Sequence, residues 1–382
     1  MVKIAVIGGK LQGTEACYLA RKAGYRTLLI EKKKGSPASG ICDEEAIFDV
    51  CLKEPELIQK LLDVDFILPA LENEIVHKSL KEIADENNIK LAFDMDAYSI
   101  SSSKIKSDIL MRDNSVPLPV YFPHCESPYL LKPSGESGSS GVHIVNTVDE
   151  VKKTLSNKTG WIAEEFLEGP SYSIEVIGVP GNYRTYKITK IHMDDVYDCN
   201  RVTSPCKIGD EQVESFNKIG TKIAELVNLH GIMDVEVIDH NGVFKVLEID
   251  ARIPSQTPTV VYHTSGVNLL EELADIVMYG EFRKEKKDNN IYCSYEHYEI
   301  EGKTVKARGE HMMGEAEPLV YIEGFMECDE SLSDYERGKT SWRGSFINHA
   351  DTEIELEEKR KKTLENLLKL AEDEVENKIK GE

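Results

Sequence analysis

The stretch VFKVLEIDARIPSQTP, residues 243–258, places two carboxylates and an arginine within five residues: Glu248, Asp250 and Arg252. Successive side chains of a β-strand point to opposite faces. These three are therefore predicted to share one face, while the apolar residues between them share the other. Charged groups beside an apolar core are costly unless a partner compensates them. Their chemistry would suit a bound cation or the charged part of a substrate.

A second acidic strand is predicted just upstream, in GIMDVEVID, where Asp234 and Glu236 lie on one face. The intervening DHNG is typical of a tight hairpin turn, which would bring Glu236 close to Glu248. Several carboxylates on one sheet face repel one another unless a cation lies among them. An all-oxygen site suits Mg²⁺ or Mn²⁺, with substrate phosphates completing the coordination. The alternative is a solvated strand face on which Arg252 merely pairs with Glu248.

The chain has 382 residues, enough for two or three domains with cores of their own. Its formal net charge is −22, from 46 basic and 68 acidic residues, which disfavours nucleic-acid binding and favours small charged substrates. Neither a signal-peptide pattern nor a membrane-spanning apolar run is present, so we expect a cytoplasmic protein without membrane association. The eight cysteines form no CxxC pair or zinc-type cluster and are expected to be reduced thiols.

The first part of the chain has the pattern of a βαβ unit. We predict a strand in KIAVIGG, a helix in LQGTEACYLARKAG closed by Gly24, and a second strand in YRTLLIEKK. Glu31, at the end of the second strand, lies where a dinucleotide-binding fold has its ribose-binding acid. Because the glycines do not spell GxGxxG, the dinucleotide-binding interpretation is weak but stays open. A strand in VDFILPALENE, a helix in VHKSLKEIADENN and a strand in IKLAFD complete a module of about 95 residues.

The middle of the chain supplies lysines and a flexible loop. Lys104 follows a serine run, and Lys132 ends a predicted strand before the Gly/Ser-rich segment from Ser134 to Gly141. GWIAEEFLEGPSYSIEVIG predicts two strands joined by a short acidic link, and FNKIGTKIAELVNLHG predicts an amphipathic helix stopped by Gly231. The C-terminal tail has helical spacing of its apolar residues.

These features, in this order, resemble the ATP-grasp ligases. The resemblance implies a Rossmann-like N-terminal domain followed by an ATP-grasp fold, a combined α/β and α+β architecture in which two subdomains clasp ATP. The implied domains are 1–95 (Rossmann-like), 96–170 (small ATP-grasp subdomain with the lid loop) and 171–382 (C-terminal ATP-grasp subdomain with the metal site and a terminal helix).

The resemblance also assigns site residues. It implies that ATP is contacted by two lysines, by the lid loop and by the acidic link: Lys104, Lys132, Ser137, Gly138, Ser139, Glu164, Glu165, Phe166 and Leu167. GIMDVEV and VLEIDAR match the family's last two strands, which implies a metal site at Glu236, Glu248 and Asp250. Asp250 stands where the family usually has asparagine, so it keeps an oxygen ligand and adds charge. Arg252, with Lys132, would neutralise charge on an acyl phosphate as a catalytic residue.

Several longer stretches, including GGKLQGTEACYLARKAG, YDCNRVTSP and EIDARIPSQTPTVVYHTSGVNL, resemble more narrowly the ligases of pyrrolysine biosynthesis. The implied reaction is ATP-dependent amide formation between the carboxylate of 3-methyl-D-ornithine and the ε-amine of L-lysine, through an acyl phosphate. No nucleophilic side chain is required, and the sequence offers no obvious histidine base beside the charged strands. A homodimer is the default expectation for such an enzyme.

Substrate contacts are expected from acids outside the metal set, because two diamino acids carry several ammonium groups. The candidates for amines are Glu72, Glu175 and Asp198; Ser255 could hold a carboxylate, Arg252 faces the activated group, and the loop Lys10, Leu11 and Gln12 could contact lysine. Each also has a plain interpretation as a surface charge or a turn residue.

Three other functions stay open on the sequence alone. The first is another ATP-grasp enzyme, an amino-acid ligase or a carboxylase-type enzyme, with different acceptors. The second is an NAD-dependent oxidoreductase built on residues 1–95, which would leave the lysines and the carboxylate strands unexplained. The third is a nucleotide-binding module without turnover.

Overall fold

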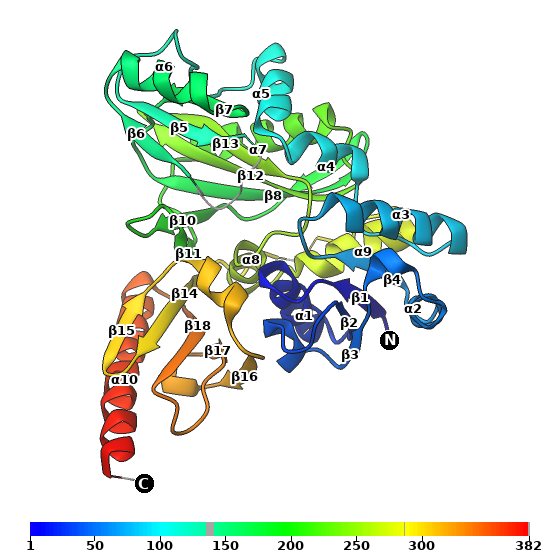
Figure 1. The fold of residues 1–382 in the computed structure, drawn as a ribbon, viewed down its shortest axis with the longest axis vertical. Coiled ribbons are helices and arrows are strands. Elements are labelled where there is room, and N and C mark those ends of the chain that lie inside the picture. The colour runs from blue at the N-terminus through cyan, green and yellow to red at the C-terminus, as the bar shows by residue number, and fades with distance from the viewer. Residues whose placement is uncertain (135–140, 286, 381–382) are drawn as a thin grey trace.

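Three β-sheets organise the part of the chain that the computed structural model describes, residues 1–134, 141–285 and 287–380 (Figure 1). The first sheet is built from the N-terminal strands, the second is small, and the third is long and antiparallel. Among the described helices, none combines the length and the apolar composition that crossing a bilayer requires.

The N-terminal sheet is parallel, with strand order β3-β2-β1-β4. Its strands are β1 (Lys3–Ile7), β2 (Arg26–Glu31), β3 (Glu44–Ile47) and β4 (Phe66–Pro69), and its helices are α1 (Leu11–Ala23), α2 (Pro55–Leu61) and α3 (Glu74–Asn87). Gly24 ends α1 in the left-handed conformation with φ 68°, as predicted. The predicted strand in IKLAFD is wrong: this segment makes only an isolated bridge, between Leu91 and Ile67.

Alternation along β1 separates two cores. Ile4 and Val6 pack with α1 in one buried cluster, whereas Ala5 and Ile7 pack in another with the buried leucines of α2 and α3. Both faces of this sheet are therefore covered, which is the usual state of a parallel sheet.

The second sheet has the order β6-β5-β7, from β5 (Tyr129–Pro133), β6 (His143–Val145) and β7 (Trp161–Glu165), with α6 (Val148–Asn157) beside it. Two helices, α4 (Met95–Ser101) and α5 (Lys104–Asp113), precede it. The serine run before Lys104 forms the junction between these two helices. Ser101 ends α4, and the side chain of Ser103 caps α5 by accepting a hydrogen bond from the Lys106 amide.

The third sheet has eleven strands, in the order β13-β12-β8-β10-β11-β14-β18-β17-β16, with β9 paired to β8 and β15 to β14. The strands are β8 (Ser171–Val179), β9 (Asn182–Thr185), β10 (Thr189–Met193), β11 (Cys199–Ser204), β12 (Gly231–His240), β13 (Val243–Asp250), β14 (Tyr292–Glu301), β15 (Thr304–Ala307), β16 (Val320–Glu323), β17 (Glu330–Ser333) and β18 (Ser341–Ala350). The associated helices are α7 (Asp210–Leu226), α8 (Thr257–Ser265), α9 (Leu269–Tyr279) and α10 (Glu353–Lys380). Helix α7 begins earlier and ends earlier than predicted, since Gly231 already opens β12.

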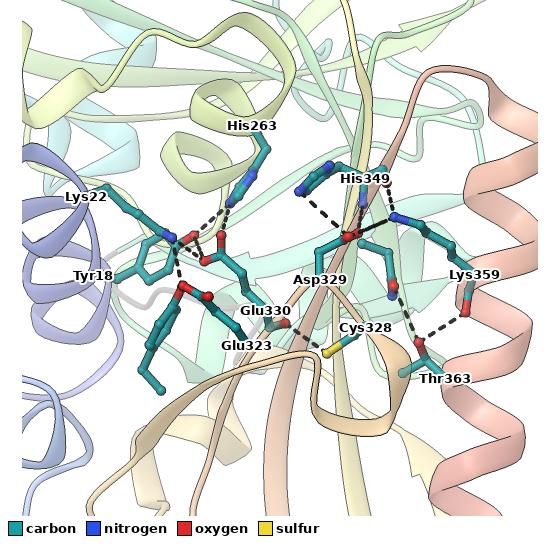
Figure 2. A network of polar contacts seen from close by, with 12 residues as sticks. Tyr18, Lys22, His263, Glu323, Cys328, Asp329, Glu330, His349, Lys359 and Thr363 are labelled. Atoms are coloured by element: carbon teal, nitrogen blue, oxygen red, sulfur yellow. Dashed lines mark hydrogen bonds and ion pairs between the residues drawn. The ribbon is translucent and has the colours of Figure 1, made fainter.

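The N-terminal module is fastened to the third sheet by a buried polar network (Figure 2). Lys22 and Tyr18 of α1 both reach Glu330 of β17, with Nζ and the hydroxyl each 2.7 Å from Oε2. The same hydroxyl lies 2.7 Å from Nε2 of His263 on α8. Burial lowers the pKa of His263 to about 4, so this ring is neutral at pH 7. Helices α1 and α8 are thereby held against one strand.

We expect Glu330→Ala to destabilise the protein strongly, because it leaves the ammonium of Lys22 in a largely buried position without its carboxylate. Removing one partner of such a pair costs about 3–5 kcal/mol. The free energy of the first unfolding transition in urea measures the effect. Glu327→Ala is the matched control, since that exposed acid makes only a 4.0 Å ion pair with Lys362. Equal stability of the two variants would contradict the assignment.

Candidate active site

The β12–β13 hairpin brings the predicted carboxylates together. Asn241 and Gly242 turn the chain with φ 55° and 85°, as a tight hairpin turn requires. A β-bulge between Glu236 and Val237 shifts the register, so that Glu236 lies opposite Glu248 and Asp234 lies opposite Asp250. The predicted approach of Glu236 to Glu248 is confirmed.

These acids are crowded in a partly buried place. Burial, with Glu248 and Asp250 nearby, raises the pKa of Glu236 to about 8. Burial also raises the pKa of Asp250 to about 7, although the guanidinium of Arg252 opposes that shift. An electrostatic field of this kind favours any cation that can enter among the carboxylates.

Two side-chain cations already face the hairpin. Lys104 Nζ lies 2.5 Å from Glu248 Oε1, and Arg252 Nη2 lies 2.9 Å from Asp250 Oδ2 and 2.6 Å from Glu72 Oε1. Within the described residues, two buried atoms beside them lack a hydrogen-bond partner: Arg252 Nε and Asp234 Oδ1. A donor and an acceptor left over at one place indicate a site that a polar ligand completes.

The chain's own side chains do not form a closed metal cage. Across residues 1–134, 141–285 and 287–380, no group of three or more His, Cys, Asp and Glu is spaced to hold a metal ion. The oxygen chemistry of Glu236, Glu248 and Asp250 nevertheless fits Mg²⁺, which keeps waters and substrate phosphates in its coordination shell instead of relying on a protein cage. The metal assignment stays a prediction.

A cavity of about 490 Å³ lies beside the hairpin and gathers the predicted nucleotide residues. Its lining includes both lysines and the whole acidic link: Lys104, Lys132, Glu164, Glu165, Phe166 and Leu167. Apolar side chains supply much of the rest, among them Leu130, Ile238 and Leu247. A cavity of this size, with apolar walls and two lysines in its lining, suits a nucleoside carrying phosphates.

The two acids of the predicted link, Glu164 and Glu165, end strand β7. Glu164, predicted to contact ATP, lines the cavity, and its carboxylate lies 2.6 Å from Lys132 Nζ; both side chains are buried. Glu165 turns to Lys245 and accepts a hydrogen bond of 2.8 Å from the Val120 amide. Phe166 and Leu167, which follow Glu165, add apolar side chains to the lining of the same cavity.

The lid residues Ser137, Gly138 and Ser139 lie outside the described residues. Ser134, at the start of that segment, is fixed to the beginning of α5. Its carbonyl accepts from the Lys104 amide at 3.1 Å, and its hydroxyl accepts from the Ile105 amide at 3.2 Å. Ser134 therefore lies beside the first residues of α5, next to Lys104.

A second cavity, of about 210 Å³, adjoins the first. The two share the residues Ile191, Met193, Tyr197, Glu236 and Glu248 in their linings. The second cavity is markedly acidic, with seven carboxylates: Glu72, Asp198, Asp234, Glu236, Glu248, Asp250 and Glu310. The carboxylate hairpin thus stands between a nucleotide-sized space and a space suited to a positively charged small molecule.

Most of the expected substrate residues meet in this second cavity: Leu11, Gln12, Glu72, Asp198, Arg252 and Ser255. Two do not. Lys10 is exposed and absent from the lining. Glu175 is fully buried on β8, opposite Asp234, and lines neither cavity. Its position therefore does not support the predicted contact with substrate.

Two lining residues were missed from the sequence, Glu310 and His311, at the start of the 3₁₀ segment η3 (Glu310–Glu315). Ser255 and Gln256 each donate a hydrogen bond to Glu310 Oε2, at 2.6 and 2.7 Å. Gln256 does so from a left-handed backbone with φ 64°, which is uncommon for this residue type. No local motif marks Glu310, because its partners are more than fifty residues away.

Comparison with known proteins agrees with this geometry. Residues 101–256 match the family model of the ATP-grasp domain. Two 3-methyl-D-ornithine–L-lysine ligases are similar over most of the chain. The one from Methanosarcina mazei is 39% identical over 294 residues, covering 77% of each chain. The one from Methanosarcina acetivorans is 41% identical over 301 residues, covering 78% of this chain and 79% of the relative.

Solved structures share the fold at low identity. A biotin carboxylase from Campylobacter jejuni, in complex with a β,γ-ATP ligand, has a TM-score of 0.72 at 15% identity and covers 99% of this chain and 96% of its own. The biotin carboxylase domain of a Hydrogenobacter thermophilus 2-oxoglutarate carboxylase, with MgADP, ADP and bicarbonate, has a TM-score of 0.68 at 17% identity and covers 91% and 86%.

Proposed function

The chain belongs to the family of 3-methyl-D-ornithine–L-lysine ligases, with the ATP-grasp fold, and from this premise we propose the reaction that its two cavities carry out. The protein uses ATP to activate the carboxylate of 3-methyl-D-ornithine and joins it to the ε-amine of L-lysine. One observation supports this most strongly. The nucleotide-sized cavity and the acidic cavity share Glu236 and Glu248 at their boundary, so a phosphoryl group and a carboxylate could meet there.

In the first half-reaction a carboxylate oxygen of 3-methyl-D-ornithine attacks the γ-phosphorus of ATP, ADP leaves, and an acyl phosphate forms. Lys104 and Lys132, which line the nucleotide-sized cavity, would neutralise phosphate oxygens from one side, and Arg252, which lines the acidic cavity, from the other. Mg²⁺ bound with ATP at Glu236, Glu248 and Asp250 would supply further charge neutralisation; Mn²⁺ offers the same chemistry. This step needs positioning and charge compensation, with no nucleophilic side chain.

In the second half-reaction the neutral ε-amine of lysine attacks the acyl carbon, and phosphate leaves with the oxygen that came from the carboxylate. The amine nitrogen loses one of its two protons as the amide forms, and the released phosphate can take it. The acids of the second cavity match the spectator ammonium groups of both substrates, which would otherwise be unpaired once water is excluded.

A substrate panel separates this function from its rivals. We expect release of ADP to require both amino acids together with ATP and Mg²⁺, and product mass to equal the sum of the two amino acids minus water. Bicarbonate, or other amino-acid pairs, should support far less ADP release. Faster turnover with bicarbonate would favour a carboxylase-type enzyme, and binding of NADH in place of ATP would favour an oxidoreductase.

A further inference from the structure

His311 is the only histidine in the lining of either cavity, as far as the described residues show. It is joined to Asp198, which comes from the segment before β11, although 113 residues separate the two in sequence. His311 Nδ1 lies 2.7 Å from Asp198 Oδ1, and the His311 amide donates to Oδ2 of the same carboxylate at 3.2 Å. Both oxygens of Asp198 therefore hold one residue in place.

This contact fixes the tautomer of the ring. Because a carboxylate accepts, Nδ1 carries the hydrogen, and Nε2 is the atom left to take a proton. The His311 side chain is 51% exposed, so water can receive the proton afterwards. A base oriented by a second group through its other nitrogen is the arrangement that general-base catalysis uses.

We propose that His311 is the general base for amide formation and that Asp198 is its positioning residue. The inference rests on the proposed function. A protonated ε-amine cannot attack, and its reference pKa is about 10.4, so at neutral pH a lysine substrate needs a proton acceptor. His311 Nε2 takes one proton from the ε-ammonium, and the amine's electron pair forms the bond to the acyl carbon. The C–O bond to phosphate then breaks, the leaving phosphate takes the second proton from the nitrogen and departs as hydrogen phosphate, and the imidazolium releases its proton to water.

Other groups lining the cavity are less suited to this role. Glu310 already accepts two hydrogen bonds on one oxygen, and Glu72 is paired with Arg252. Burial raises the pKa of the Cys199 thiol well above its usual value, which keeps it protonated. The hairpin acids face Lys104 and Arg252 and are proposed to bind the cation that accompanies ATP.

The charges around His311 set the pH at which it acts. The hydrogen bond that His311 donates to Asp198 raises the pKa of His311 above its usual 6.5, and Glu310 and Glu72 act in the same direction while burial opposes them. The amide-forming step should therefore gain rate as the pH rises through the raised pKa of His311.

The test compares lysine with hydroxylamine as the acceptor of the acyl group. Hydroxylamine is mostly neutral at pH 7 and needs no base, so hydroxamate formation reports acyl phosphate formation alone. We expect His311→Gln to lower the rate of amide formation with lysine about 100-fold at pH 7 and to leave hydroxamate formation unchanged. The deficit should shrink at higher pH, as more lysine becomes neutral in solution.

Three variants complete the design. Asp198→Asn should move the pH inflection of the lysine step to lower pH, because the contact that raises the pKa of His311 is lost. His311→Ala should regain part of its lysine rate with added imidazole. His230→Gln is the matched control, since the His230 ring is exposed, with Nδ1 3.7 Å from Asp94 Oδ2, and His230 lines neither cavity.

Two outcomes overturn the inference while the proposed function stands. In one, the wild type forms the amide and His311→Gln keeps its lysine rate. In the other, His311→Gln loses lysine and hydroxylamine rates equally, with no rescue of His311→Ala by imidazole. Absence of the amide in the wild type would instead refute the proposed function itself.

Discussion

Replacing Glu248 with glutamine is expected to lower the rate of ADP release by about 100-fold or more, while the protein keeps its fold. The substitution preserves size and removes the charge that faces Lys104 and the predicted cation site. Loss of one group that stabilises developing charge typically costs about 10²–10³ in rate. Initial rates of ADP release with both amino acids present, and circular dichroism of the variant, measure the two halves of this expectation.

Asp250→Asn provides a comparison on the same face of the hairpin. Asparagine is the residue usual at this position in the wider family and still offers an oxygen ligand, so we expect this variant to retain turnover. Near-normal ADP release by a folded Glu248→Gln variant would show that the metal assignment is wrong. Complete loss of activity in Asp250→Asn would show that this acid has a separate role, through its contact with Arg252.

Arg252→Lys is expected to lower both half-reactions by about 100-fold. The guanidinium reaches Asp250 and Glu72 at once through Nη2, with Nε left without a partner among the described residues. A lysine ammonium keeps the positive charge but cannot present the planar fork that matches a phosphate or carboxylate. Hydroxamate formation and lysine amide formation should therefore fall together.

The contrast with His311→Gln makes this prediction specific, since that variant should slow the lysine step alone. Retention of charge in Arg252→Lys also limits the loss of stability, because the buried acids are not left without a cation. An Arg252→Lys variant with normal hydroxamate formation would contradict the placement of Arg252 at the acyl phosphate.

The hairpin was predictable because its signals are local. An Asn-Gly turn sets the register near the tip, where Val237 pairs with Val246. A β-bulge between Glu236 and Val237, which no local signal marks, then brings Glu236 opposite Glu248. Lys104, Lys132 and the acidic link were recognised from their order in the sequence, and the structure places all of them in the lining of one cavity.

The positions of Glu175 and His311 could not be predicted from the sequence. Whether a strand face is open or covered depends on neighbours that the strand itself does not specify, and both faces of β8 are buried. The place of His311 depends on a contact with Asp198 across 113 residues, from a short 3₁₀ segment without periodicity. Sequence patterns carry little information on tertiary contacts of this kind.

The central claim, activation of a carboxylate as an acyl phosphate followed by attack of the lysine ε-amine, is tested most directly by isotope transfer. With 3-methyl-D-ornithine labelled with ¹⁸O in its carboxylate, the account predicts one labelled oxygen in each phosphate released, one ADP per amide, and a product linked through the ε-nitrogen of lysine. Phosphate free of the label, or a product linked through the lysine α-amine, would contradict it.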